Sequence, residues 1–264
     1  MAVGDFLPVK HTYEKGGVYR VTLSGVCNNL YGLYKYDIST SNGNKLSTAV
    51  SKWLWGVAVP KDSTSPLQYA YGSFFGCQGL KYLGYGVFHN ITKCKEVPHL
   101  YDGATLARIE PWMLYGGYNL ESIAYTFENC QMIEIDKDTF KHCSKVTNAE
   151  HAFHRCTSLV KLPKGLLNPL INLENASLMF KSCTNLLEIE DGEKLFDACT
   201  KLTNVEECFC GGGYHGDASY SSIMKIKSAL PSLWLRSNIT NHSAYAKGCK
   251  YAANYTQAVI HGWT

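Results

Sequence analysis

Histidine and cysteine lie close together near the middle of the sequence, and these residue types could hold a metal ion. His151, His154 and Cys156 form one group, and His142 with Cys143 stands shortly before it. A structural zinc site needs four convergent ligands. However, Cys143 and Cys156 each stand three residues after a Phe, in a spacing that recurs along the chain. This recurrence indicates packing, so the sequence predicts no metal site here.

A second group of thiols is less regular. Cys208 and Cys210 flank Phe209 and fall outside the recurring cysteine position, with His215 nearby. A disulfide bond or a ligand role is therefore left open for this pair. A nucleophilic enzyme would place one Cys or Ser beside a base and an orienting group. The cysteines recur many times instead, and no G-x-S-x-G sequence is present.

Carboxylates gather in two segments that a glycosidase could use as an acid and base pair. The two sets are Glu134, Asp136 and Asp138, and Glu188, Glu190, Asp191 and Glu193. Both occupy strand-to-turn positions of a repeat, where charged side chains normally face solvent. We therefore predict no catalytic residues, no metal and no cofactor, and we expect a protein that is not an enzyme. A carbohydrate-active enzyme is kept as an alternative.

The strongest pattern is a repeat in which Phe, Cys and an apolar residue follow one another at intervals of three. It occurs six times, at Phe74/Cys77/Leu80, Phe127/Cys130/Ile133, Phe140/Cys143/Val146, Phe153/Cys156/Leu159, Phe180/Cys183/Leu186 and Phe196/Cys199/Leu202. This spacing places one apolar row along a tight helical turn and the short strand after it. Cys serves there as a small hydrophobic residue. We therefore expect the six repeat cysteines to be buried free thiols.

Alternate copies of the repeat resemble each other best. Copies such as NAEHAFHRC and NASLMFKSC lie 27 residues apart, and partner units surround Phe140, Leu167 and Phe196 between them. The full period is therefore about 26 to 29 residues, within the range of solenoid repeats. One coil cannot bury its apolar face alone, so stacked coils must build a continuous core. The sequence predicts a repeat solenoid, leucine-rich-repeat-like, made of short strands plus short helical turns.

The repeat carries a resemblance to a known family. Segments such as MFKSCTNLLEI and LFDACTKLTNV resemble the BspA-like leucine-rich repeats of bacterial surface proteins and of phage tail or virion proteins. The N-terminal residues His11–Tyr13 and Gly17–Gly25 are similar to a hairpin that precedes these repeats, and Tyr251–Trp263 to a short helix that ends them. The resemblance implies binding as an adhesin or as a receptor-binding or structural part of a phage particle.

These features divide the chain into three parts. Residues 1–72 form a β-rich N-terminal cap region, residues 73–210 contain the BspA-like repeats, and residues 211–264 form a C-terminal cap with a capping helix. The Gly211–Gly213 run marks the start of the last part as a loop. We expect one continuous structure, because no long linker separates the parts.

The composition and net charge of the chain limit the classes of partner that it is expected to bind. Charged residues make up only 18%, and 25 Lys and Arg against 22 Asp and Glu give a net charge of +3 without long runs of either sign. This is no electrostatic footprint for nucleic acid. No apolar stretch reaches the roughly 20 residues of a membrane span. We expect neither nucleic-acid binding nor membrane insertion, and the N-terminal residues contain no apolar secretory signal.

Aromatic residues point to the binding region. Of 18 Tyr, 13 lie at or before Tyr125, and none falls between 126 and 213. Rigid amphipathic aromatics are typical of interfaces, because they bury area at low entropic cost. We therefore predict ligand or partner binding at Trp53, Trp55, Tyr82, Tyr85, Trp112, Tyr115 and Tyr118. The alternative is that these rings fill gaps in irregular coils.

The resemblance thus implies a non-enzymatic binding or structural protein located in a virion, as a tail-fibre, baseplate or capsid-attached component. Its partners would be a host surface protein or glycan, or other virion subunits, and a homo-oligomer is left open. A reducing cytoplasm during folding suits many unpaired cysteines. A bacterial cell-surface adhesin is the main alternative.

Overall fold

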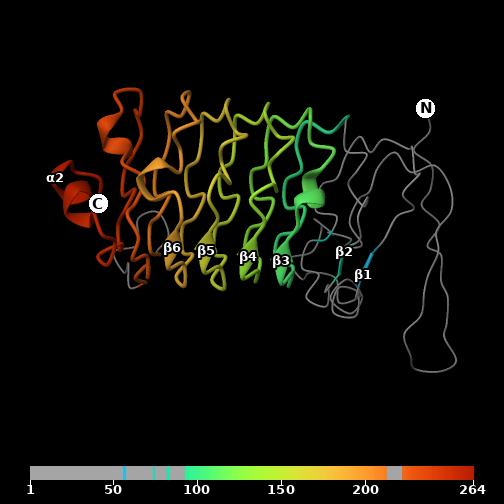
Figure 1. The fold of residues 1–264 in the computed structure, drawn as a ribbon, viewed down its shortest axis with the longest axis horizontal. Helices are drawn as coiled ribbons and strands as arrows, with labels where there is room; N and C mark the ends of the chain where they lie inside the picture. Colours follow the sequence, from blue (N-terminus) through green and yellow to red (C-terminus); the bar gives the residue numbers. More distant parts are fainter. Residues whose placement is uncertain (1–55, 58–73, 75–81, 84–92, 213–221) are drawn as a thin grey trace, which may run out of the picture.

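The computed structural model describes residues 56–57, 74, 82–83, 93–212 and 222–264. In this part the chain winds into a row of similar coils that advance along the long axis of the molecule (Figure 1). Parallel bridges join equivalent residues of successive coils, in the order Glu96, Ser122, Asn148, Asn175, Asn204 and Asn241. The first five lie 26 to 29 residues apart, which is the period of the sequence repeat.

Short strands form a second row of inter-coil contacts. They are β1 (Gly56–Val57), β2 (Tyr82–Leu83), β3 (Arg108–Ile109), β4 (Glu134–Ile135), β5 (Lys161–Leu162) and β6 (Glu188–Ile189). β1 pairs with β2, β3 with β4 and β5 with β6, all in parallel. Each strand from β3 to β6 buries its second residue and leaves its first more accessible. Side chains alternate along a strand, so two residues suffice to give each coil one inner and one outer position.

Backbone hydrogen bonds between coils run in both directions along the stack. In the turn around Phe153, the N–H groups of His151 and Phe153 donate to carbonyls of the next coil, at Ser177 and Met179. At the bridge row, by contrast, the N–H groups of Thr147 and Asn148 donate backward to the carbonyl of Glu121 in the preceding coil. Buried backbone groups need such partners. Each interior coil therefore satisfies its polar backbone through both neighbours.

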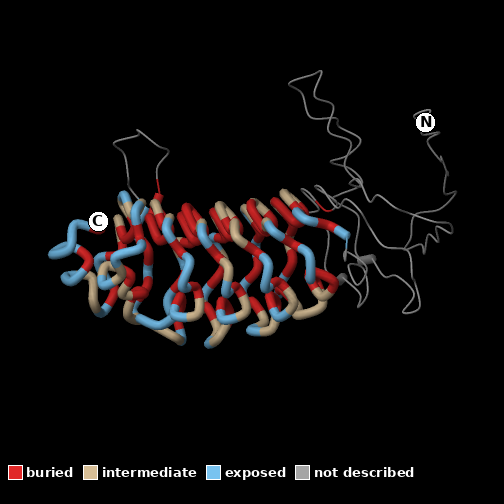
Figure 2. The backbone as a smooth tube through the Cα atoms, turned by 90° about the horizontal axis from the view of Figure 1, so that it is seen from above, coloured by how far each residue is buried: buried red, intermediate tan, exposed pale blue. Residues whose placement is uncertain are grey.

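An aromatic row occupies the centre of the stack. Phe74, Tyr101, Phe127, Phe153, Phe180 and Phe209 stack in sequence with ring centroids 5.2–5.7 Å apart. All six rings are at most 1% exposed. The hydroxyl group of Tyr101 donates to the carbonyl of Met113, which lets a Tyr occupy a position filled elsewhere by Phe. Figure 2 shows that buried segments recur at the same level in successive coils.

The repeat cysteines form a second row beside the rings. The thiols of Cys130, Cys156 and Cys183 donate to the carbonyl oxygens of Tyr101, Phe127 and Phe153, each one coil earlier, at 2.8–3.1 Å. All nine cysteines in the described ranges are buried and free. The predicted burial of five repeat cysteines is confirmed, and Cys77 lies outside the described residues. Cys is thus small enough for the slot and also supplies a donor to a backbone carbonyl.

The alternate units fill a third row. Phe140, Leu167 and Phe196 are buried there, and Phe140 meets Phe153 edge-to-face at 6.0 Å. Gly117 stands where Cys143 stands one coil later. A Cβ atom at Gly117 would lie 2.9 Å from the carbonyl oxygen of Leu114 and 3.0 Å from the sulfur of Cys143. Glycine is therefore required by the close approach of these two coils.

The remaining short helices lie at turns and at the C-terminal end. They are η2 (Pro111–Leu114), η3 (Gly192–Lys194), η4 (Leu233–Leu235) and α2 (Tyr255–Ile260). After α2, Trp263 packs against Tyr245 and is only 5% exposed. The backbone carbonyl of Trp263 accepts the N–H of Ala246. In earlier coils the corresponding N–H, such as that of Phe209, donates to a carbonyl of the next coil. The C-terminal residues thus cover the end of the apolar row.

The periodic contacts extend beyond the repeat segment expected from the sequence. β1 lies in the expected cap 1–72, yet it stands the usual 26 residues before β2 and pairs with it. At the other end, the bridge from Asn204 to Asn241 crosses the expected boundary at residue 210. Both pairings continue the parallel contacts of the interior coils. None of the helices in the described ranges has the length and apolar character that a membrane span requires.

Replacing Phe153 by Ala should lower the free energy of unfolding by about 3–5 kcal/mol, because the ring is fully buried between Phe127 and Phe180. Urea unfolding followed by circular dichroism measures this loss. Ile171→Ala is the matched control, since Ile171 is 50% exposed and should change stability by less than about 0.5 kcal/mol. Equal losses for both variants would contradict the packing described.

The thiols should be unreactive in the native protein and reactive once it unfolds. Burial raises the pKa of Cys143 and of Cys199 to about 12, so these groups hold their protons at neutral pH. Reaction with Ellman's reagent should be slow in buffer. In guanidinium without reductant it should reveal at least the nine described thiols of the eleven cysteines. Recovery of two or fewer would mean that the cysteines are paired.

Candidate functional site

Three of the predicted binding residues lie on one short stretch of chain. Trp112 belongs to η2, and Tyr115 and Tyr118 follow in the turn after it. Trp112 and Tyr115 are half-buried, whereas Tyr118 is 47% exposed. The three residues follow one another at intervals of three along this stretch. We call Trp112, Tyr115 and Tyr118 the aromatic patch.

A histidine of the following coil supports this patch. The ring of His142 contacts Tyr115 edge-on at 4.6 Å and Tyr118 at 4.7 Å between centroids. Burial, helped by the charge of neighbouring Lys141, lowers the pKa of His142. The imidazole is therefore neutral at neutral pH and packs as an aromatic ring. The patch thus combines apolar ring surface with tyrosine hydroxyl groups, which suits a partner that is partly polar.

The other predicted aromatics have different outcomes. Trp53, Trp55 and Tyr85 lie outside the described residues. Tyr82 belongs to β2, opposite Gly56 of β1, and its side chain is not described. Tyr101, part of the same aromatic-rich half, is fully buried in the central ring row. For Tyr101 the packing alternative is correct.

A row of polar residues directly follows the ring row, and the sequence analysis missed it. The residue after each ring is, in successive coils, Asp102, Glu128, His154, Lys181 and Cys210. Beside them stand His99, Tyr125 and His151, each two residues before a ring and each with a φ angle of 54–60°. Tyr125 stacks between His99 and His151 at 5.0 and 4.7 Å. These positions are 26 residues apart, so the period could have revealed them.

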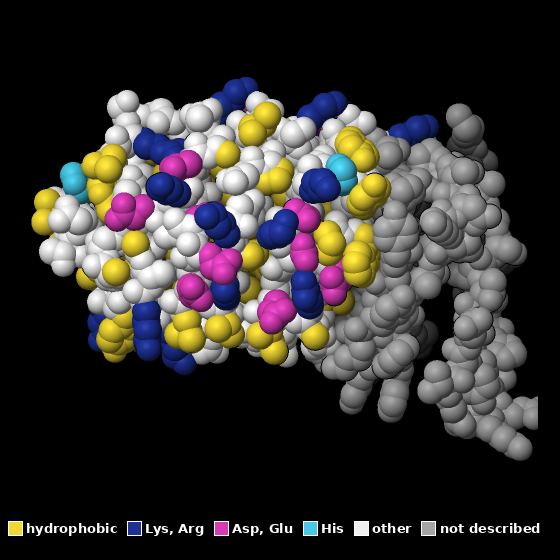
Figure 3. All heavy atoms as spheres, viewed as in Figure 1, with side chains coloured by type: hydrophobic (Ala, Val, Ile, Leu, Met, Phe, Trp, Pro, Cys, Tyr) yellow, Lys and Arg dark blue, Asp and Glu magenta, His cyan; other side chains and the backbone are white. Residues whose placement is uncertain are grey.

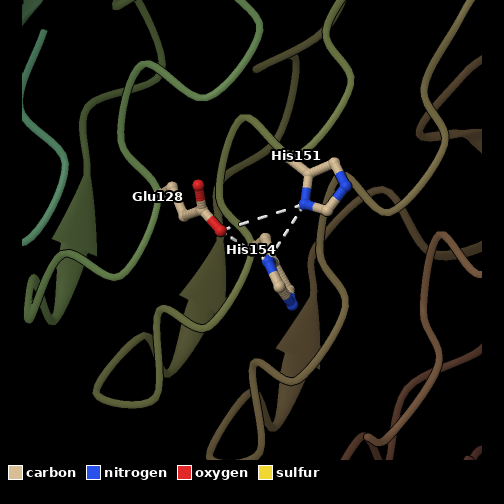
Figure 4. A group of neighbouring side chains, drawn as sticks. All are labelled: Glu128, His151 and His154. Carbon is tan, nitrogen blue, oxygen red and sulfur yellow. Dashed lines mark hydrogen bonds and ion pairs between the residues drawn. The ribbon is translucent and has the colours of Figure 1, made fainter. Parts of the chain in front are cut away.

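Two histidines and a carboxylate converge within this polar row. The Nδ1 atom of His154 lies 2.8 Å from Oε1 of Glu128 and 3.0 Å from Nδ1 of His151, and His151 is 3.9 Å from the same carboxylate oxygen (Figure 4). The side chains are 9–18% exposed. We call Glu128, His151 and His154 the His–Glu cluster. A separate pair, His99 with Asp102 at 2.8 Å, lies on the adjoining coil.

Burial controls the charge of the His–Glu cluster. Desolvation, followed by the electrostatic interaction with His154, lowers the pKa of His151 to about 4, so this ring is neutral at pH 7. Burial alone would raise the pKa of Glu128, but the hydrogen bond and the electrostatic interaction with His154 outweigh it and lower the pKa overall. The carboxyl group is therefore ionised. Neutral imidazole and an ionised carboxylate are the forms in which these groups bind cations.

The structure separates the histidines from the cysteine with which the sequence grouped them. The thiol of Cys156 donates to the carbonyl of Phe127 and belongs to the core. His142 belongs to the aromatic patch instead. Cys208 and Cys210 are free and buried, so a disulfide between them is not formed. The third member of the group is Glu128, which no local sequence motif indicated, and not Cys156.

The carboxylates considered as an acid and base pair are held by cations and backbone amides. Arg108 contacts Asp136 at 2.8 Å and Glu134 at 3.6 Å on the neighbouring coil. Lys161 pairs with Glu188 and Glu190 in the same way two coils later. Figure 3 shows Lys and Arg side chains interspersed with Asp and Glu over this face. Opposite charges placed across neighbouring strands support their pairing.

Comparison with known proteins adds no family to this geometry. No protein-family model matches the chain, and no curated protein matches it.

One ion pair of the polar row is fully buried. Lys181 and Glu207 contact each other with both side chains 3% exposed. Lys181→Met should destabilise the protein by about 3–5 kcal/mol, because it leaves a buried carboxylate without its cation. The double variant Lys181→Met with Glu207→Met should recover most of that loss, since no charge remains. Urea unfolding of the three proteins tests this, and a double variant as unstable as the single one would contradict it.

Proposed function

We propose that the protein is a non-enzymatic binding or structural component of a phage virion, built as a leucine-rich-repeat-like solenoid. It would serve in a tail fibre, a baseplate or a capsid-attached position. Its partner would be a host surface protein or glycan, or another virion subunit. The observation that carries this proposal is the aromatic patch on the coil stack.

The patch has the chemistry of a recognition surface. Tyr118 exposes nearly half of its surface, at a position where the next two coils hold the exposed residues Ser144 and Ile171. Aromatic rings stack on sugar faces and on apolar side chains of proteins, while the tyrosine hydroxyl groups offer hydrogen bonds. Tyr and Trp also dominate the binding energy of protein interfaces. The proposal therefore assigns recognition to Trp112, Tyr115 and Tyr118.

The coils support recognition by holding the patch rigidly. Tyr115 and Tyr118 both pack on His142 of the next coil. Nearby, the ammonium group of Lys145 donates to the side-chain oxygen of Asn119 across the same two coils at 2.7 Å. A rigid surface loses little conformational entropy when a partner binds. Stacked coils provide such surfaces in many repeat proteins.

Two other functions remain as alternatives. A bacterial cell-surface adhesin would use the same patch for the same kind of partner, on a chain carrying a secretion signal and an anchor. A carbohydrate-active enzyme would need two carboxylates facing an open pocket. The charge pairs of Glu134, Asp136, Glu188 and Glu190 with Arg108 and Lys161 favour a stabilising role for these carboxylates.

Replacing Tyr115 and Tyr118 together by Ser should abolish partner binding and leave the fold intact. The double variant removes both rings that rest on His142. Binding of the labelled protein to a glycan array and to bacterial cells measures the first effect, and circular dichroism the second. Tyr251→Ser is the matched control, since Tyr251 is 57% exposed near the C-terminal end. Normal binding by the double variant would place the site elsewhere.

The genes beside this one distinguish the virion protein from the adhesin. Phage structural genes on both sides would support a virion component. A longer reading frame with a signal peptide and a surface anchor would support the adhesin instead.

A further inference from the structure

The His–Glu cluster contains more acceptors than hydrogen atoms can serve. The Nδ1 atom of His154 makes two short contacts, to Glu128 and to Nδ1 of His151. It carries at most one hydrogen atom, and the ionised carboxylate carries none. If His154 donates to Glu128, it has no lone pair for His151; if it accepts from His151, its contact with Glu128 has no hydrogen atom. Hydrogen bonding therefore satisfies only one of the two contacts well.

A cation satisfies all three atoms at once. A point equidistant from Oε1 of Glu128 and the two Nδ1 atoms lies about 2 Å from each, given their separations of 2.8, 3.0 and 3.9 Å, and Zn²⁺ binds nitrogen and oxygen ligands at about 2.0–2.2 Å. Two imidazoles and one carboxylate also form a donor set that binds zinc elsewhere. We propose that Glu128, His151 and His154 bind a divalent transition-metal ion of the Zn²⁺ type.

The neighbouring pair of His99 and Asp102 shows why the proposal is confined to this cluster. Their contact joins one imidazole nitrogen and one carboxylate oxygen at 2.8 Å, so a single hydrogen atom satisfies it. His99, Asp102 and Glu128 also lie within reach of one ion. Unlike the His–Glu cluster, this set contains no close contact between two nitrogen atoms. A metal there would have to displace a good hydrogen bond.

The backbone holds the three ligands in place before any ion arrives. Glu128 lies on one coil and both histidines on the next, and the N–H of Asn129 donates to the carbonyl of His154 at 2.7 Å across that junction. The ring of Tyr125 stacks on His151 at 4.7 Å and fixes its plane. Lys181, the nearest cation along the polar row, is neutralised by Glu207. A preformed site avoids the entropic cost of ordering its ligands.

Three protein ligands leave a coordination position for water or for an anionic group of a partner. This is the arrangement of open zinc sites, whereas closed structural sites use four protein ligands. The cluster is partly accessible, because Glu128 and His151 are each 18% exposed. The ion would link two neighbouring coils and present a positive centre beside Tyr125. This role is independent of the aromatic patch.

Titration of the untagged, metal-free full-length protein with Zn²⁺ tests the proposal. Isothermal calorimetry should show one Zn²⁺ bound per chain in reducing buffer. His151→Leu should abolish this binding or weaken it by more than the roughly 10–100-fold that loss of a supporting partner costs. Leu is suitable because Leu178 occupies the same position on the next coil with a φ of 56°, against 55° for His151. Glu128→Gln is the second variant, and circular dichroism confirms that each variant folds.

Two controls and one spectrum exclude other sites. His261→Ala, at the exposed end of the chain, and His99→Gln, in the neighbouring pair, should both bind Zn²⁺ as the unchanged protein does. The Co²⁺ complex should show visible ligand-field absorption without the near-ultraviolet band of a thiolate ligand. A thiolate band, loss of binding in His99→Gln but not in His151→Leu, or no Zn²⁺ binding by the unchanged protein would each overturn the proposal.

Discussion

Backbone hydrogen bonding between neighbouring coils is the constraint on which the other features depend. It sets a rise per coil near the spacing of paired strands, about 4.8 Å. Flat rings placed one per coil must then stack almost face to face, as the 3–6° angles along Tyr101, Phe127, Phe153 and Phe180 show. The ring centroids lie 5.2–5.4 Å apart, close to this general strand spacing. Side chains therefore adapt to a spacing that the backbone has already determined.

The same spacing explains why residues far apart in sequence act together. Positions one period apart in the sequence become direct neighbours in the stack. Each row therefore brings together side chains from equivalent positions of successive coils. The row after the rings contains Asp102, Glu128, His154 and Lys181. Glu128 and His154 of this row thus lie in hydrogen-bond contact although 26 residues separate them along the chain. Left-handed backbone angles at His99, Tyr125 and His151 cost roughly 1–2 kcal/mol each. They persist because inter-coil hydrogen bonds and ring contacts hold every turn in the same conformation.

The sequence revealed the periodic rows whose residue types repeat, and missed those whose types change. Phe and Cys recur in register, so their burial and their separation into alternate units could be predicted. The search for the Phe and Cys spacing did not find Tyr101, because Ala104 rather than Cys follows it by three residues. In the last coil Cys249 follows Ala246 by three residues, so Ala246 takes the ring position and Tyr245 stands one residue before it. Glu128 was not predicted as a site residue for a different reason. Its partner His154 becomes its neighbour only after folding, whereas a motif search along the chain compares nearby residues. Counting in steps of one period would have placed it beside His154.

The contacts of Trp263 with Ala246 and Tyr245 affect which backbone groups at the C-terminal end of the stack are open to other molecules. Along the stack, the backbone edge of one coil is a template for the next, and an unpaired edge invites strands of foreign chains. At the C-terminal end the chain supplies its own last acceptor, since the carbonyl of Trp263 receives the N–H of Ala246 and its indole covers Tyr245. The C-terminal residues therefore cover part of the backbone edge at this end of the stack. Pairing of this covered edge with a strand of another chain is therefore less favourable than pairing at an open edge would be.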